Sequence, residues 1–223
     1  MLNIENLRFK HPNCKDNCID NISFQVNEGE IISLLGESGS GKTTILRLIS
    51  GLEGSVDGKI TIDNVVVNDK NIFVDPSNRK VSMVFQDYAL FPHMTVKDNI
   101  GFGIKKLSKL ERQDKIRECL RLVRMEEYIN RYPHELSGGQ MQRIAIARAL
   151  AIDPKILLLD EPFSNLDSNL QEAIRGELEE IIRSVGITCI LVTHDREDAL
   201  KISDRIINIE KGKVKSIDKI RSR

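Results

Sequence analysis

The sequence lacks the features of a membrane-spanning, secreted or disulfide-stabilised protein. No apolar run approaches the roughly 18 residues that a bilayer-spanning helix needs. The first residues, MLNIEN, lack the basic stretch and apolar segment of a secretory signal. Four cysteines in 223 residues do not make a disulfide framework. These absences predict a cytosolic protein that contacts a membrane only through a partner.

Net charge and internal repeats are missing as well. The 33 Lys and Arg residues balance 33 Asp and Glu residues, which argues against a broad electrostatic grip on nucleic acid but leaves a local basic patch possible. No period of about 20–50 residues repeats, so solenoid folds are excluded. At about 150 residues per domain, the length corresponds to one large domain or two lobes.

The order of the expected elements indicates an α/β fold. The first third predicts strands separated by turn residues, and a tight turn over 27–30 joins two of them. The last third predicts short apolar strands with a helix over 170–184 between them. Apolar strands that alternate with helices predict a parallel sheet covered on both faces. The expected strands are residues 4–9, 22–26, 31–35, 59–67, 156–159 and 188–192.

The middle of the chain carries helical signals instead. Residues 108–111 read SKLE, a capping box, and apolar residues follow it at helical spacing. A second helix is predicted from Ser137 to Ala151. We therefore expect a mainly parallel α/β core with an antiparallel β lobe, over residues 1–87 and 151–223, and a helical insertion over about 88–150.

A phosphate-binding loop follows the strand over 31–35 and precedes a helical segment. It matches the pattern G-x-x-x-x-G-K-[ST] without a mismatch. Its glycines allow backbone N–H groups to surround phosphate oxygens, and the helix adds its positive N-terminal end. The alternative, a glycine-rich turn that matches by chance, does not explain the strand and helix on either side. The expected triphosphate ligands are Gly36, Glu37, Ser38, Gly39, Ser40, Gly41, Lys42, Thr43 and Thr44.

Two carboxylates end the apolar strand over 156–159. In a parallel sheet, ligands bind where strands end, so Asp160 and Glu161 are expected beside the phosphate loop. Asp160, with the Thr43 hydroxyl, is a candidate ligand of Mg²⁺. Glu161 is a candidate general base for the attacking water. The alternative is that acids end strands because they favour solvent.

A second glycine-containing motif, LSGGQ, occupies residues 136–140. Ser137 and Gln140 have the spacing of a capping box, which explains these two residues by local structure. Paired glycines are poor choices for a first helical turn, so Gly138 and Gly139 suggest that another molecule approaches the backbone. This motif resembles the signature of the ATP-binding cassette (ABC) family.

The resemblance covers nearly the whole chain. Gln86 in VFQD resembles the Q-loop of the family, Asp167 in SNLD the D-loop, and His194 in VTHD the switch histidine. The resemblance implies that Gln86 contributes to the Mg²⁺ shell, His194 contacts the γ-phosphate and Asp167 acts across a dimer; a local helix-capping role remains the alternative for Asp167. The implied catalytic residues are Lys42, Gln86, Glu161 and His194.

The resemblance also implies a homodimer that closes on ATP. Each of two ATP molecules would lie between the phosphate loop of one copy and the signature Ser137, Gly138, Gly139 and Gln140 of the other. The N-terminus of the helix that begins at Ser137 is suited to a γ-phosphate. Binding would close the dimer and hydrolysis would open it.

The N-terminal segment departs from the family pattern. Relatives usually place an aromatic residue where adenine stacks, and that slot holds His11, whereas Phe9 is expected in the core. An imidazole offers less stacking area than Tyr. His11, Cys14 and Cys18 could alternatively be three metal ligands, or the two cysteines could be reduced thiols in a turn. Cys119 and Cys189 are expected to be small core residues.

Residues 88–100, YALFPHMTVKDNI, resemble the importer branch for iron, polyamines, sulfate, sugars or thiamine. The resemblance implies a membrane-spanning permease as partner, a substrate-binding protein as indirect partner, and a place at the cytoplasmic face of the membrane. The apolar residues of this stretch either receive a permease helix or pack the helical lobe. Many relatives in this branch continue into a C-terminal regulatory domain that this sequence does not include, either through truncation or because it is a short member.

Two other classes compete with an importer subunit. A soluble ABC ATPase that acts on nucleic acid or the ribosome would carry a long coiled coil or a second cassette, and neither occurs here. A P-loop kinase or GTPase would leave LSGGQ unexplained, and no N-K-x-D guanine motif occurs.

Overall fold

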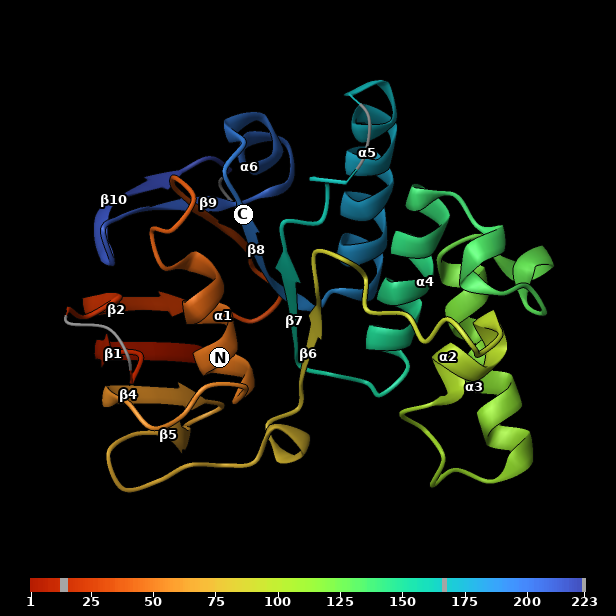
Figure 1. Ribbon diagram of the computed structural model, residues 1–223, viewed down its shortest axis with the longest axis horizontal. Coiled ribbons are helices and arrows are strands. Elements are labelled where there is room, and N and C mark those ends of the chain that lie inside the picture. Colours follow the sequence, from red (N-terminus) through yellow and green to blue (C-terminus); the bar gives the residue numbers. More distant parts are fainter. Residues whose placement is uncertain (13–15, 166–167, 222–223) are drawn as a thin grey trace.

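The computed structural model describes residues 1–12, 16–165 and 168–221. Figure 1 shows an antiparallel sheet at one end, a central sheet in the middle and a group of helices at the other end. The antiparallel sheet has the strand order β2-β1-β4-β5. These strands are β1 (Leu2–Phe9), β2 (Ile19–Val26), β4 (Asp57–Ile62) and β5 (Val65–Asn68).

The central sheet has the order β10-β9-β3-β8-β7-β6. Neighbouring strands from β9 to β6 pair in parallel, and only the edge strand β10 is antiparallel to its neighbour. This mainly parallel sheet, together with the antiparallel sheet, confirms the predicted α/β fold class. The strands are β3 (Ile31–Leu35), β6 (Val81–Val84), β7 (Ile156–Asp160), β8 (Thr188–Thr193), β9 (Arg205–Glu210) and β10 (Lys213–Lys219).

The helices divide between the core and the far end of the molecule. The core helices are α1 (Lys42–Ser50), α5 (Ser168–Val185) and α6 (Arg196–Ile202). The stretch of chain between β6 and β7 forms α2 (Val96–Gly101), α3 (Lys109–Leu122) and α4 (Gly138–Leu150). Short 3₁₀ turns lie at Pro76–Asn78, Glu126–Tyr128 and Pro133–Glu135.

Alternating side chains of the central strands feed two separate hydrophobic cores. Ile156 and Leu158 of β7 pack on one face with α1 and the antiparallel sheet. Leu157 and Leu159 pack on the other face with residues of α4, α5 and α3. This alternation follows from the two-residue period of a strand. The helix after the phosphate loop and the helix after LSGGQ therefore cover opposite faces of one sheet.

One expectation about the first third needs correction. The single strand expected over 59–67 is two strands, because Asp63 (φ 48°) and Asn64 (φ 63°) form a turn between β4 and β5. Two successive residues with positive φ are typical of a tight hairpin turn, and Asn and Asp tolerate that conformation. The turn over 27–30 exists, with the Glu30 N–H donating to the Asn27 carbonyl. It joins strands of different sheets, β2 and β3.

Both expected capping boxes are present. Ser108 caps α3 and pairs reciprocally with Glu111. Ser137 caps α4 and pairs reciprocally with Gln140. Each box satisfies N–H groups that a helix start leaves without a partner within the helix.

The stretch over 88–100 contributes both buried and partly exposed apolar side chains to the helical end. Val96 and Ile100 are fully buried in the core of the helical end. Phe91 is only half-buried, and its ring lies 4.5 Å from that of Phe102, which is 40% exposed. Buried Asn99 holds the loop before α2, because its side chain bonds both backbone polar groups of Phe91.

No helix in the described part of the chain combines the length and the apolar character that crossing a membrane requires.

Candidate functional site

The phosphate loop joins β3 to α1 at the carboxyl edge of the central sheet. Gly41 caps the helix with φ 101°, a left-handed value that a side chain disfavours. A Cβ at Gly36 would lie 2.2 Å from the carbonyl oxygen of Ile209 on β9. These two glycines are therefore required by backbone conformation and by close packing, which explains the spacing of the motif in structural terms.

The Lys42 side chain turns back across the loop. Its Nζ donates to the carbonyl oxygens of Gly36, at 2.7 Å, and Glu37, at 2.8 Å. Burial lowers the pKa of Lys42, while the charges of Glu161 and Asp160 act in the opposite direction. Because an ammonium group has three donors, one remains to meet a phosphate oxygen.

A pair of oxygen ligands lies at the start of α1 and the end of β7. The Thr43 hydroxyl donates to Asp160 Oδ1 at 2.8 Å. Burial raises the pKa of Asp160, and the hydrogen bond from Thr43 opposes this effect. A hydroxyl and a desolvated carboxylate at one point are the oxygen donors that Mg²⁺ prefers. These two side chains therefore fit the metal that the sequence predicted at this edge.

Replacing Asp160 by Asn is expected to stabilise the nucleotide-free chain while it weakens its response to Mg·ATP. Since the folded-state pKa of Asp160 is raised, its stabilising contribution is complete below the unfolded value of 3.8 and is lost as pH rises through the folded pKa. At neutral pH the ionised carboxylate therefore disfavours the empty fold, and Asn removes that charge.

We expect the melting temperature of Asp160→Asn at pH 7.5 to rise by about 2–4 °C, the shift for roughly 1 kcal/mol at this size. Thermal unfolding with and without Mg·ATP tests both parts. Below the unfolded pKa the two chains should unfold alike. A melting temperature below that of the unaltered chain, or an undiminished response to Mg·ATP, contradicts this assignment.

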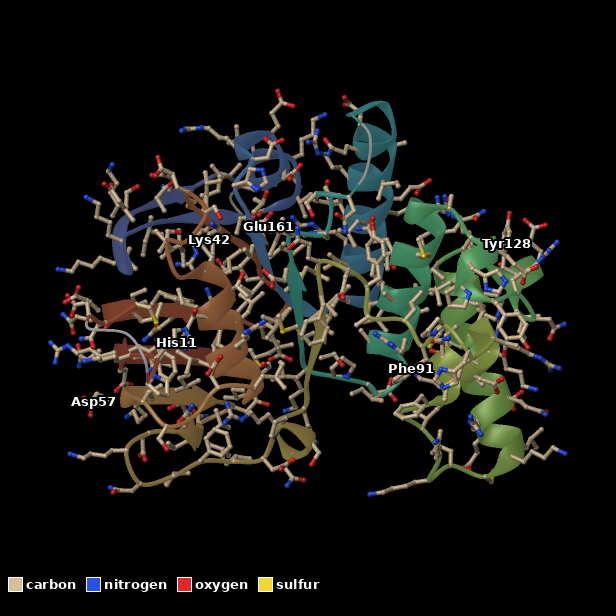
Figure 2. The ribbon with its side chains drawn as sticks, viewed as in Figure 1. His11, Lys42, Asp57, Phe91, Tyr128 and Glu161 are labelled. Carbon is tan, nitrogen blue, oxygen red and sulfur yellow. The ribbon has the colours of Figure 1, made fainter. Side chains whose placement is uncertain are left out.

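Glu161 and His194 form a second pair beside the loop. Glu161 follows β7 with φ 45°, and its N–H donates to the Val192 carbonyl oxygen of β8. His194 Nδ1 lies 3.0 Å from Glu161 Oε2. Because an ionised carboxylate only accepts hydrogen bonds, Nδ1 carries the hydrogen in this pair. Figure 2 shows Lys42 and Glu161 to the left of the molecule's centre, away from Phe91 and Tyr128 at the helical end.

A hollow opens between these groups. It is lined by the start of the phosphate loop and by Glu161, His194 and Arg196. Arg196 is exposed and is the first residue of α6. Arg196 was not among the residues expected at the site; its position two residues after His194 is the only signal that could have found it.

Gln86 follows β6, the edge strand beside β7. Its side chain is exposed, and its carbonyl oxygen accepts a 2.7 Å hydrogen bond from Asn165 Nδ2. The segment after Glu161 thus contacts the segment after β6. Asp167, proposed to act across a dimer, lies outside the described residues.

The LSGGQ segment does not take part in this hollow. Among the described residues that line the hollow, none belongs to 136–140. Ser137 is exposed and Gly138 half-exposed at the start of α4, which lies across β6 and β7 from α1 (Figure 1). The two motifs that the sequence assigns to phosphate binding are therefore separate in one chain.

His11 lies just beyond β1. Its ring is half-buried and packs edge-on against the Phe9 ring at 4.9 Å, and Phe9 itself is buried. Figure 2 places His11 by the antiparallel sheet, toward one end of the molecule. The expected core position of Phe9 is confirmed, whereas adenine stacking by His11 stays a prediction.

The cysteines outside the N-terminal loop are core residues, as predicted. Cys119 and Cys189 are buried, and burial raises the pKa of the Cys119 thiol to about 11 and that of Cys189 further. Cys14 lies outside the described residues, and Cys18 Sγ contacts the Phe9 carbonyl oxygen. Across the ranges that the structure covers, no three His, Cys, Asp or Glu side chains form a metal-binding group.

Known proteins similar to this chain are import ATP-binding proteins. A sequence model described as ABC transporter matches residues 19–164. The spermidine/putrescine import ATP-binding protein PotA of Oleidesulfovibrio alaskensis is 49% identical over 205 residues, which cover 91% of this chain and 54% of that protein. The Fe(3+) ions import ATP-binding protein FbpC of Pasteurella multocida is 46% identical over 198 residues, covering 88% and 56%.

The sulfate/thiosulfate import ATP-binding protein CysA of Neisseria meningitidis is 49% identical over 202 residues, which cover 88% of this chain and 56% of that protein. The chain thus spans little more than half the length of these relatives.

Solved structures cover the whole chain. The dimeric, post-hydrolysis ATP-binding cassette MJ0796 bound to ADP and Pi has a TM-score of 0.85 and 34% identity, with 100% of both chains covered. The cbiO1 protein of Clostridium perfringens, part of the ABC transporter complex cbiONQ, has a TM-score of 0.86 and 28% identity, covering 98% of this chain and 88% of that one.

Proposed function

This chain belongs to the ABC transporter family, and we propose that it is the ATP-hydrolysing, energy-coupling subunit of an importer. One observation carries the proposal: a phosphate loop, the Thr43–Asp160 pair and the Glu161–His194 pair meet at one edge of one sheet. A cation, an oxygen ligand pair and a base beside a phosphate cradle are the parts that phosphoryl transfer to water needs.

In this proposal the phosphate loop and the remaining Lys42 donor hold the triphosphate. Thr43 and Asp160 hold Mg²⁺, with Gln86 completing its shell, and the metal when bound supplies positive charge to the phosphate oxygens. Glu161 accepts a proton from the attacking water. His194 keeps the Glu161 carboxylate in place through its Nδ1 hydrogen and turns toward the γ-phosphate as the site fills.

We further propose that two copies share each ATP. The signature of a single chain lies on the opposite face of the sheet from its own phosphate loop, so a second copy is needed to bring Ser137, Gly138 and Gly139 to the γ-phosphate. A head-to-tail dimer would supply two such sites. The similarity to dimeric cassettes, one of them bound to ADP and Pi, supports this arrangement.

The proposed partners are a membrane-spanning permease and, through it, a substrate-binding protein. The names of the relatives describe import of polyamines, iron and sulfate or thiosulfate, and a similar structure belongs to a transporter complex. The exposed face of Phe91 and Phe102 at the helical end is the surface we assign to the permease. This assembly would hold the chain at the cytoplasmic face of the membrane.

Two measurements test the proposal. Purified chain should release phosphate from ATP in a reaction that needs Mg²⁺ and stops with EDTA. Affinity purification from native membranes should recover a permease, and the amount should fall when Phe102 is replaced by Glu. A chain that binds no ATP contradicts the enzymatic proposal, and recovery of ribosomes or nucleic acid in place of a permease contradicts the importer proposal.

A further inference from the structure

Arg175 is a buried cation in the middle of α5, and it faces three acids of the chain that follows β8. Its Nε donates to Asp198, and its Nη2 donates to Asp195 Oδ2 at 3.1 Å. Its Nη1 lies 3.6 Å from Glu197 Oε2. The side chain is only 6% exposed. A buried guanidinium with this many partners has one available position.

The acids around Arg175 hold the backbone on both sides of His194. The Thr193 hydroxyl donates to Asp198 Oδ2 at 2.8 Å and accepts from the Asp195 N–H at 3.0 Å. Asp195 in turn caps α6 by accepting from the Glu197 N–H. Thr193 and Asp195, the two neighbours of His194, therefore both belong to the hydrogen-bonded group around Arg175.

The His194 side chain itself has little to hold it. It is 59% exposed, and within the described parts of the chain its ring makes a polar contact with Glu161 alone. Its position beside the phosphate loop consequently depends on where the backbone at Thr193 and Asp195 lies.

Arg175 also reaches the segment that carries Glu161. Its Nη2 lies 3.4 Å from Gln171 Oε1, and Gln171 Nε2 donates to the Phe163 carbonyl oxygen at 3.0 Å. Phe163 is two residues beyond Glu161. A single guanidinium thus connects to both strand ends from which the Glu161–His194 pair projects.

We infer that Arg175 is a positioning residue that sets His194 against Glu161. The inference deepens the proposed function and rests on it, since the pair it places is the proposed catalytic pair. Arg175 acts from outside the hollow and touches no substrate. Side chains held by a supporting layer of this kind keep catalytic groups within a few tenths of an ångström.

The test replaces Arg175 by Lys, which keeps the charge but cannot bond several acids from one fork. Arg183→Lys is the matched control, because Arg183 lies two turns later on α5 and ties the same helix to Asp204 and to the Ile202 carbonyl oxygen without contacting Thr193 or Asp195. In nucleotide-free chain labelled with ¹⁵N at its four histidines, Arg175→Lys should shift the ring signals of His194 alone, assigned with His194→Ala.

In ATPase assays, Arg175→Lys should lower kcat about tenfold and leave KM within about twofold, since misplacing a catalytic group by a small distance costs rate more than binding. Arg183→Lys should change neither. Unchanged His194 signals, or equal effects of the two variants on kcat, overturn the inference.

If Arg175→Lys does not fold, Thr193→Val takes its place in the test. This variant removes the hydroxyl that links Asp198 to the Asp195 N–H and leaves Arg175 in place. The same shift of the His194 signals and the same fall in kcat are expected, and their absence overturns the inference. A wild-type chain without ATPase activity would instead contradict the proposed function, and the histidine spectra would still decide the position of His194.

Discussion

A Glu161→Gln chain is expected to bind ATP as tightly as the unaltered chain and to hydrolyse it about 10²–10⁴ times more slowly, the contribution typical of a positioned general base. Gln keeps the size of the side chain, and its carbonyl oxygen can still accept from His194 Nδ1, which now lies 3.0 Å from Glu161 Oε2. It cannot accept the proton of the attacking water. Phosphate release and fluorescent-nucleotide titration measure the two effects separately.

The same variant should accumulate as a dimer when ATP is present, because the nucleotide that joins two copies is no longer removed. Size-exclusion chromatography with and without Mg·ATP shows this directly. Glu180→Gln is a suitable control, since Glu180 is exposed on α5 and pairs with Arg124; its rate and elution should match the unaltered chain. Normal turnover by Glu161→Gln would show that another group is the base.

A Gly138→Asp chain is expected to fold, to bind ATP within about twofold of normal as a single copy, and to lose at least about 10²-fold in hydrolysis, the loss seen when positioned donors to developing charge are removed. Gly138 is the first residue of α4, where the positive end of the helix dipole stabilises a carboxylate. The same carboxylate would repel the γ-phosphate of ATP held by a second copy. Stopped-flow nucleotide binding and steady-state hydrolysis separate these outcomes.

Mixing two inactive chains provides the sharper test of shared sites. Gly138→Asp retains its phosphate loop, and Lys42→Ala retains its signature, so a mixed dimer contains one undamaged site. We expect the mixture to hydrolyse ATP well above the sum of the separate variants. Lys42→Ala mixed with Glu161→Gln is the control. Lys42 and Glu161 both belong to the half of each site that carries the phosphate loop, so both sites of this mixed dimer are damaged. No recovery in the first mixture would argue that each chain completes its own site.

The distinction between positioning and catalysis gives these variants different signatures. Glu161 lines the hollow, and Lys42 bonds the carbonyl oxygen of Gly36, which also lines it, so their changes affect the reaction or the binding of nucleotide directly. Arg175 acts through the backbone around His194, so its change should be visible in the histidine ring before any nucleotide is added. Comparing the two kinds of variant separates loss of chemistry from loss of geometry.

The sequence could predict those parts of the site that local chemistry defines. Gly36 to Thr43 forms its loop because glycines permit its backbone conformation, and Asp160 and Glu161 follow directly from the end of an apolar strand. The two capping boxes are equally local, since their partners lie three residues apart. Each of these features depends on residues within a few positions of one another, so the order of residues alone determined them.

Tertiary structure decided what depends on strand order and on burial. The placement of α1 and α4 on opposite faces of the sheet follows from which residues of β7 point each way. The fork of Arg175 into Asp195 and Asp198, and the approach of Asn165 to Gln86, join segments 20 to 79 residues apart. Such contacts form only when packing selects one arrangement of the whole chain, because no local propensity links residues so distant in sequence.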